Sequence, residues 1–298
     1  MRESDWIHRY ITPLVTAQGA EGLRDDVALL SATGPMIVTM DTLVERTHFL
    51  TDDPLETVGQ KLVRVNVSDI FVKGAEPSEA LLSVAWSNHR HESEFEALIS
   101  GLGHALDSFG VALIGGDLVG TEGELTLTLT LTGRCLNDAP VRRSGGGAGQ
   151  SVLMSGEIGW GGLGLQAAKT GALEDIALRY RIPQISSLET AKTIAKHATA
   201  SLDVSDGLLI DAARLAEASG CGVEIRLDSI PLAKATENIE EIISQCVAGD
   251  DYCALISADP GASVPGFHRI GELTSTPGLH LSHRGRAVKT PSTLGFEH

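Results

Sequence analysis

Alternation of leucine and threonine is the strongest hydrophobic pattern in the chain, and it covers residues 124–133. It predicts a strand with leucines on one face and threonines on the other. The leucines are Leu125, Leu127, Leu129 and Leu131. Shorter apolar runs predict three more strands, at 36–41, 81–86 and 111–116. The threonine face suits solvent about as well as packing against another sheet or a second subunit.

A glycine-rich stretch, RRSGGGAGQS (142–151), interrupts this order, and a second series of apolar strands follows it. These later strands are predicted from the runs SVLMSG, SLDVS, CGVEIRL and YCALIS. Strands alternate with helical patterns in both halves, which indicates an α/β or mixed α+β protein. We therefore expect two domains, residues 1–140 and 141–298.

The segment KLVRVNVSDIFVKG (61–74) is apolar nearly all round and predicts a buried helix. Asn66, Asp69 and Lys73 share one stripe of that helix. A buried carboxylate must be paired or bound to a metal ion. The spacing alone favours an ion pair with Lys73, whereas the number of other acids at strand ends favours a metal.

The stretch LDVSDGLLIDAARLAEASGCGVEI (202–225) predicts a strand, a turn, a helix and a second strand. Ser205 is expected to cap the helix N-terminus, and Asp206 to lie in its first turn, where an acid suits the helix dipole. The helix should bury Leu208, Leu215 and two alanines and end before Gly220. These local roles leave Asp203, at the end of the strand, unexplained.

Aspartates recur where predicted strands end or helices begin. They are Asp25, Asp26, Asp41, Asp117, Asp203, Asp206, Asp250 and Asp251. Each one alone suits a helix cap or a turn. As a set they indicate a ligand site, because loops at strand ends gather the ligands of α/β folds, and carboxylates bind Mg²⁺ well.

The charge balance narrows the choice of partners. The chain has 298 residues, with 39 acidic side chains against 23 Lys and Arg and a formal net charge of −16. This excess argues against nucleic acid and anionic membrane surfaces as partners. A phosphorylated ligand would need a cation between itself and such a protein, and a divalent metal held by carboxylates is the obvious candidate.

Hydropathy and cysteine usage indicate a cytoplasmic protein. No apolar run approaches the roughly 18 residues of a membrane span. The first residues, MRESDWIHRYI, lack the apolar core of a signal peptide. Four scattered cysteines form no C-x-x-C pair, so packing is a better expectation for them than zinc or disulfide bonds.

Three glycine motifs invite a nucleotide interpretation. IGGDLVG (114–120) looks like a phosphate loop but carries Asp117 where a cation would be expected. GQS (149–151) lacks the lysine of a P-loop. GWGGLG (159–164) fits the dinucleotide pattern but lacks an acid about 20 residues later, so we expect it to pack a strand tightly against a helix.

Taken in order, these segments resemble the thiamine-monophosphate kinase family, part of the superfamily that includes aminoimidazole ribonucleotide synthetase. The resemblance covers essentially the whole chain. It rests on DDVALL, MDTLVERTHFL, KLVRVNVSDIFVKGAEP, LIGGD, RRSG, LDVSDGL, GDDY and the terminal GFEH. It implies two α/β domains, with the N-terminal domains paired in a homodimer around a shared β-barrel.

The resemblance also implies a reaction and a site. Enzymes of this family transfer the γ-phosphoryl group of ATP to thiamine monophosphate with the help of several Mg²⁺ ions. The implied metal ligands are Asp26, Thr39, Asp41, Asp69, Asp117, Asp203 and Asp206. The implied nucleotide contacts are Gly116, Asp117, Arg143 and Ser205, and the implied substrate contacts are His48 and Asp250.

This chemistry agrees with the acidic composition. The second pKa of a phosphate monoester is about 6, so the attacking oxygen is already ionised near neutrality. The barrier lies in repulsion and alignment, which metal ions held by carboxylates reduce. We therefore expect no side chain to act as a general base.

The chain departs from the family pattern at several positions, including the loss of an arginine soon after Asp117 and of an aromatic residue just ahead of GFEH. Met40 and Leu118 stand where the family has threonine, and Cys253 stands where it has an acid. The proposed carboxylate ligands remain intact. Two alternatives stay open: a nucleotide-binding regulatory protein whose catalysis has decayed, and a sibling ATP-dependent enzyme that acts on another substrate.

Overall fold

The structure is a computed structural model that describes residues 3–23, 30, 34–171 and 173–296. It divides into two compact units. Unit 1 comprises Met1–Ile70 and Glu76–Asp138, and unit 2 comprises Phe71–Ala75 and Ala139–His298. Five residues from the middle of the unit 1 sequence, 71–75, therefore pack with unit 2. The single boundary expected between residues 140 and 141 does not account for this exchange.

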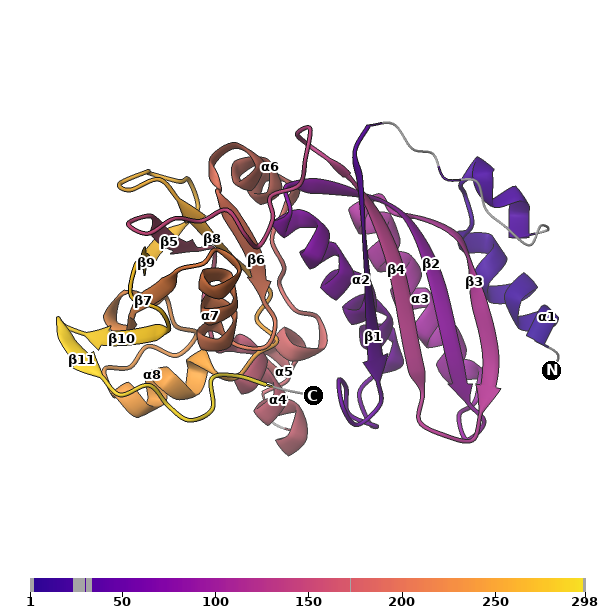
Figure 1. Cartoon of the computed structure of the whole chain (residues 1–298). Coiled ribbons are helices and arrows are strands. Elements are labelled where there is room, and N and C mark those ends of the chain that lie inside the picture. The colour runs from indigo at the N-terminus through magenta and orange to yellow at the C-terminus, as the bar shows by residue number, and fades with distance from the viewer. Residues whose placement is uncertain (1–2, 24–29, 31–33, 172, 297–298) are drawn as a thin grey trace. The chain divides into compact units, whose positions relative to one another are not determined.

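Unit 1 is built on a four-stranded sheet of order β1-β4-β2-β3 (Figure 1). The strands are β1 (Met36–Val44), β2 (Ala75–Ser87), β3 (Ala112–Thr121) and β4 (Thr126–Cys135). β1 pairs antiparallel with β4, and β2 pairs parallel with β3. A register shift beside Ala80 and Leu81 marks a β-bulge in the β2–β3 pair.

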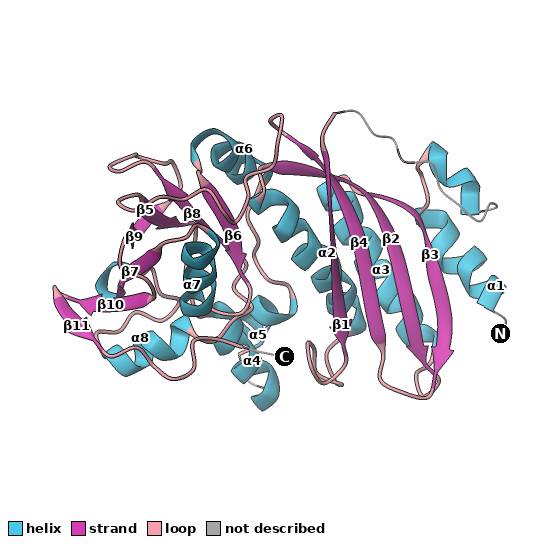
Figure 2. Cartoon of the chain, in the orientation of Figure 1, coloured by secondary structure: helices cyan, strands magenta, loops and turns pink. Residues whose placement is uncertain are grey.

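Two helices, α2 (Leu55–Val72) and α3 (Glu92–Phe109), cover one face of this sheet, as Figure 2 shows. The four leucines of β4 point into this covered face and are fully buried, which confirms the expected alternation. α2 and α3 approach closely at Gly101, where an added Cβ would lie 1.8 Å from the Glu56 carbonyl oxygen. The interior of unit 1 is thus a helix layer packed on one side of a sheet.

The other face of the sheet carries exposed apolar side chains. Val38 is 67% exposed and Met40 64% exposed, both on β1, and the β4 threonines are half-buried on the same face. Thr42 and Thr128 share a hydrogen bond between their hydroxyls at 2.8 Å. Among the described strands this sheet is open, with β1 and β3 as its edges, and it closes no barrel by itself.

Short helical turns precede the sheet: α1 (Glu3–Trp6), η1 (Ile7–Ile11), η2 (Thr12–Leu14) and η3 (Gln18–Leu23). Trp6 packs against Phe95 of α3 and Trp86 of β2, with ring centroids 4.5 and 5.8 Å away. Ile7, Ile11 and sheet residues line a cavity of about 930 Å³ on the open face. The N-terminal turns are therefore anchored by aromatic packing beside the exposed sheet surface.

Unit 2 contains a seven-stranded, mostly antiparallel sheet of order β11-β10-β7-β9-β5-β8-β6. Its strands are β5 (Ser151–Met154), β6 (Ala200–Val204), β7 (Gly222–Arg226), β8 (Cys253–Ala258), β9 (His268–Thr274), β10 (Leu279–His283) and β11 (Arg286–Val288). Only the β7–β10 pair is parallel among the pairings given for this sheet. β6 and β8 lie side by side and antiparallel, so the loop that follows β6 and the loop that precedes β8, which carry predicted site residues, lie at the same end of the sheet.

The helical elements of unit 2 are α4 (Trp160–Thr170), α5 (Glu174–Arg181), α6 (Leu188–His197), α7 (Leu208–Ala218), η4 (Leu227–Ser229) and α8 (Ile239–Cys246). The inward residues predicted for α7 are buried, and Gly220 follows the helix with a positive φ of 67°. The buried residues of α7 form one apolar core with residues of β6, β7 and β8.

The segment 71–75 contributes Val72 to a second apolar cluster of unit 2. Val72 is fully buried there beside Leu153 and Ile194. Lys73 donates a hydrogen bond from Nζ to the Ser201 carbonyl of β6, and its own carbonyl accepts from Val141 N–H at 3.0 Å. Among the described residues, no helix combines the length and apolarity needed to cross a bilayer.

Candidate active site

Unit 1 brings three of the predicted metal ligands together where β1 passes α2. Thr39 and Asp41 lie two residues apart on the helix-covered face of β1, and Asp69 projects from α2. Thr39 Oγ1 donates to Asp69 Oδ2 at 2.5 Å. The backbone N–H of Asp41 donates to Oδ1 of the fully buried Asn66, at 3.1 Å. These contacts fix β1 against the helix and hold its oxygen ligands in one place.

The two carboxylates of this group repel each other. Burial and, to a smaller extent, the negative charge of Asp69 together raise the pKa of Asp41 to about 7. Oxygen donors with this much unbalanced negative charge suit a hard divalent cation. Thr39, Asp41 and Asp69 therefore fit Mg²⁺ by donor chemistry.

The ion pair between Asp69 and Lys73 that the spacing favoured is not formed. Lys73 lies one residue beyond the end of α2, where its ammonium reaches the Ser201 carbonyl, while Asp69 accepts from Thr39. The helix ends between the two residues, so they do not stay on one stripe.

Gly116 and Asp117 lie on β3, which β4 and β2 separate from β1. Within this chain Asp117 is thus not close to the Asp41–Asp69 pair; it is exposed and lines the open-face cavity. An added Cβ at Gly116 would lie 1.8 Å from the Leu82 carbonyl oxygen. The glycine is therefore required for the close approach of two strands, whether or not a nucleotide also binds there.

His48 follows β1 in a tight turn. Its Nδ1 accepts from the Val44 N–H at 3.0 Å, which places the proton of a neutral imidazole on Nε2. The buried Lys61 of α2 donates to the His48 carbonyl at 3.2 Å. The backbone of the predicted substrate contact is therefore held rigidly by its neighbours.

In unit 2, Asp203, Ser205 and Asp206 cluster at the end of β6. The expectation that Ser205 caps α7 is wrong. The helix begins at Leu208 after Gly207, whose φ of 129° and ψ of 146° favour glycine, and no side chain of the preceding loop caps it. The loop is instead fixed by Asp211, which lies inside the helix. Its Oδ2 accepts hydrogen bonds from the N–H groups of Ser205 and Asp206, both at 3.1 Å.

Asp211 and Arg214 were not singled out from the sequence. Asp211 is buried, and burial followed by the charge of Asp206 raises its pKa to about 6. Arg214 Nη1 donates to Asp211 Oδ1 at 3.0 Å and also to Asp206 Oδ2. A first-turn aspartate normally indicates only a favourable dipole interaction, so the sequence offered little sign that this one orients a loop.

Asp250 lies beside the same loop. Its N–H donates to the Ser205 carbonyl, and the N–H of Tyr252 donates to that of Val204, both at 2.8 Å. Asp250 has a positive φ of 60°, and its carboxylate accepts from the Tyr252 hydroxyl at 2.8 Å. The C-terminal segment contacts the same loop, because Phe296 N–H donates to the Asp206 carbonyl at 2.8 Å. GDDY, LDVSDGL and GFEH thus meet in one place.

Arg143 lies in the exposed segment ahead of β5. Its carbonyl accepts from Ser219 Oγ at 3.4 Å, while the preceding carbonyl, that of Arg142, accepts from Ser201 N–H at 2.8 Å. The segment is therefore fixed to β6 through its backbone, and the Arg143 side chain is presented on the surface.

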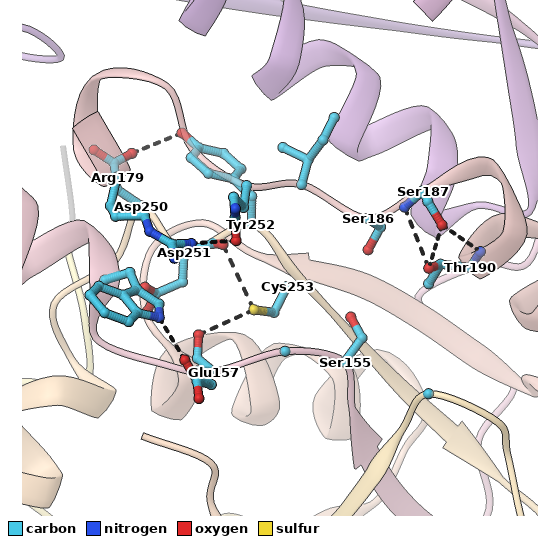
Figure 3. A pocket seen from close by; sticks show the side chains of 15 residues that line it. Ser155, Glu157, Arg179, Ser186, Ser187, Thr190, Asp250, Asp251, Tyr252 and Cys253 are labelled. Atoms are coloured by element: carbon cyan, nitrogen blue, oxygen red, sulfur yellow. Dashed lines mark hydrogen bonds between the residues drawn. The ribbon is translucent and has the colours of Figure 1, made fainter. Parts of the chain in front are cut away.

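A cavity of about 460 Å³ opens next to Asp250 in unit 2 (Figure 3), within the size range of ligand pockets, roughly 300–1,000 Å³. Its wall includes Glu157, Trp160 and Arg179. The buried Asp251 accepts from the N–H groups of Gly159 and Gly161, at 2.9 and 3.0 Å, and fixes the start of α4. The glycines of GWGGLG are tightly packed, but against α5, α8 and the loop before β8, and not against a strand as expected. The motif borders a pocket that the sequence did not reveal.

Apart from Asp117, the predicted ligands among the described residues form two groups, one in each unit. Asp26 lies outside the described residues. Among the residues that the structure describes, no three His, Cys, Asp or Glu side chains come close enough to form a metal cluster by themselves. The unit 1 group reaches three oxygen donors only by including the hydroxyl of Thr39.

Comparison with known proteins defines the class of this chain. Residues 24–135 match the N-terminal domain of AIR synthase related proteins, and residues 147–281 match their C-terminal domain. The thiamine-monophosphate kinase of Caulobacter vibrioides is 35% identical over 99% of this chain and 90% of its own length. The chain therefore belongs to the thiamine-monophosphate kinase family.

Solved structures of thiamine-monophosphate kinases have the same fold as this chain. The thiamine-monophosphate kinase of Stenotrophomonas maltophilia matches with a TM-score of 0.78 and 28% identity, over 89% of this chain and 91% of its own. AaThiL complexed with AMPPCP and TMP also gives a TM-score of 0.78, with 26% identity over 99% of this chain and 98% of its own. The two-domain fold implied by the sequence motifs is confirmed.

Proposed function

We propose that this chain transfers the γ-phosphoryl group of ATP to the phosphate of thiamine monophosphate and so forms thiamine diphosphate. Its membership of the family supports this, as does the likeness to AaThiL complexed with AMPPCP and TMP. The observation that carries the proposal is the Asp41–Asp69 pair, whose repulsion a divalent cation would relieve. In an acidic protein such a cation would neutralise the two phosphates and bring them together.

The metal ligands we propose are Thr39, Asp41 and Asp69 in unit 1 and Asp203 and Asp206 in unit 2, together with Asp26 and Asp117. Bound Mg²⁺ would supply charge neutralisation and alignment of the reacting groups. The protein's own part is to hold these oxygens still: α2 fixes Asp69 against Thr39, and Asp211 fixes the loop of Asp206. Gly116, Arg143 and Ser205 are proposed to contact the nucleotide.

His48 and Asp250 are proposed to contact thiamine monophosphate. The cavity beside Asp250 supports this, because it is large enough for a heteroaromatic ring system and carries acidic side chains. Thiamine is a cation, so a wall with excess negative charge favours it. The rigid Asp250–Tyr252 turn keeps that wall in position.

We also propose that two chains pair through the open faces of their four-stranded sheets to close a β-barrel. The exposed Val38 and Met40 support this, since contiguous exposed apolar side chains mark interaction surfaces. Pairing would also remove the exposed sheet edges.

Incubation of the purified protein with ATP, Mg²⁺ and thiamine monophosphate tests the function, with thiamine diphosphate measured by chromatography. Product is expected, and it should disappear with EDTA or in Asp69→Asn. ATP binding is measured in parallel by calorimetry. Binding without product would refute the kinase and favour the regulatory alternative. Turnover of another acceptor in place of thiamine monophosphate would favour a sibling enzyme.

A further inference from the structure

The cavity beside Asp250 has a wall that the family motifs do not describe. Trp160 begins α4 and lines the cavity, and its Nε1 donates to Glu157 Oε2 at 2.8 Å. The neighbouring backbone is held by Asp251 through Gly159 and Gly161. The indole is thus fixed from two sides, by a carboxylate on its edge and by a rigid helix start, as a specificity-determining side chain requires.

A positively charged side chain already lies over the face of this indole. Arg179 of α5 places its guanidinium carbon 4.6 Å from the centre of the Trp160 ring, in a cation–π arrangement. The Gln184 side-chain oxygen accepts a hydrogen bond from Arg179 Nη1 and holds it there. The same position would accept the cationic ring of a ligand.

The charges around the cavity favour a cation. Its described lining contains the carboxylates of Glu157, Asp250 and Asp251 against the single guanidinium of Arg179. In the described chain the buried Ser186 hydroxyl has no hydrogen-bond partner. Figure 3 shows the Ser155 and Ser186 hydroxyls pointing toward each other across this space. The lining therefore offers an aromatic face, excess negative charge and a hydroxyl that a ligand's polar edge could pair.

We infer that the Trp160 face is the subsite for the cationic thiazolium end of the acceptor, and that this ring takes the place of the Arg179 guanidinium. The inference rests on the proposed function, because it assigns the thiamine end of the substrate to this cavity. Arg179 keeps the indole face covered until the ligand arrives. The subsite selects a charged heteroaromatic ring over a neutral one of similar size, since a cation–π contact needs the positive charge.

Titration of thiamine monophosphate without ATP tests the subsite independently of phosphoryl transfer. The chain has three tryptophans, Trp6, Trp86 and Trp160. Fluorescence of the wild type should be quenched on binding, and the quench should be absent in Trp160→Phe, which still folds and binds. Trp160→Ala should weaken thiamine monophosphate binding on the order of tenfold, with ATP affinity unchanged. Thermal unfolding confirms that each variant is folded.

Arg179→Met provides the second arm, with Lys169→Met on the exposed side of α4 as a control for the loss of one positive charge. If the thiazolium ring displaces the Arg179 guanidinium, Arg179→Met should bind thiamine monophosphate about threefold more tightly, and Lys169→Met should have a smaller effect. Weaker binding by Arg179→Met, or the same quench in Trp160→Phe as in the wild type, would overturn the inference. Product formation by the wild type in either case would leave the proposed function standing.

Discussion

Asp41 and Asp69 stand close together at the junction of β1 and α2, and the charge of Asp69 helps burial to raise the pKa of Asp41 to about 7. Thr39, which contacts Asp69, completes a group of three oxygen donors. Such a pair is costly for the fold by itself. Its cost is explained if the protein retains it to bind a cation.

Asp41→Asn should stabilise the protein in the absence of Mg²⁺. The pKa of Asp41 rises from 3.8 to about 7 on folding, so this acid destabilises the fold progressively as pH rises between those values, and fully above them. Removing it should add about 1–3 kcal/mol at pH 8 and flatten this part of the pH profile. Thermal unfolding from pH 4 to 8 measures both.

With Mg²⁺ present, the wild type should become more stable than Asp41→Asn, because the ion stabilises the wild type and not the variant. Asp138→Asn, which changes an exposed carboxylate of unit 1, is the matched control and should behave like the wild type. If Asp41→Asn gains as much stability from Mg²⁺ as the wild type does, Asp41 is not a metal ligand.

Arg214→Met should increase the affinity for Mg²⁺. In the structure the Arg214 guanidinium contacts Asp206, a proposed ligand, and so competes with a metal for that carboxylate. Removing a partly exposed ion pair of this kind should lower the dissociation constant about threefold. Isothermal calorimetry with Mg²⁺ and ATP measures it. Arg269→Met, which removes a similar pair with Glu272, should leave the affinity unchanged.

Asp211→Ala should destabilise unit 2 and disorder the loop of Asp206. The substitution leaves two half-buried backbone N–H groups without their acceptor and removes one partner of Arg214. We expect a loss of about 2–4 kcal/mol, measured by urea unfolding. Asp211→Asn keeps one acceptor oxygen and should lose less. Equal losses in the two variants would mean that charge, and not the hydrogen bonds, is what matters.

Val38→Asp should convert the proposed dimer into a monomer. Val38 is 67% exposed on the open face of the sheet, where a charge would be trapped between two sheets in a closed barrel. Light scattering after gel filtration measures the mass. Leu173→Asp, at a site that is 68% exposed in unit 2, is the control and should remain dimeric. A monomeric wild type would contradict the pairing directly.

Elements with a repeating hydrophobic pattern were predictable from the sequence. The leucine and threonine alternation placed β4 and its buried face correctly, because a strand buried on one side leaves a period of two in the sequence. The all-round apolar character of 61–74 likewise indicated α2. The family resemblance correctly gave the two-domain fold, and it named residues whose roles stay predictions.

Contacts between distant segments were not predictable from pattern. Lys73 seemed a partner for Asp69 by helical spacing, but the helix ends first and its ammonium reaches Ser201. Ser205 has the residue type of a cap, yet the conformation of Gly207 delays the helix and Asp211 satisfies the loop. Trp160 and Arg179 meet only because α4 and α5 pack together. In each case tertiary structure outweighed a local preference.

The exchange of residues 71–75 bears on how the chain can be built and divided. Val72 lies in an apolar cluster of unit 2, although more than sixty residues of unit 1 are still to follow it in the sequence. A fragment that starts at residue 139 would therefore lack part of its own interior. During synthesis the ribosome delivers this piece first, and the C-terminal half must later assemble around it. The two units are distinct as structures, yet no single cut separates them as independently folding modules.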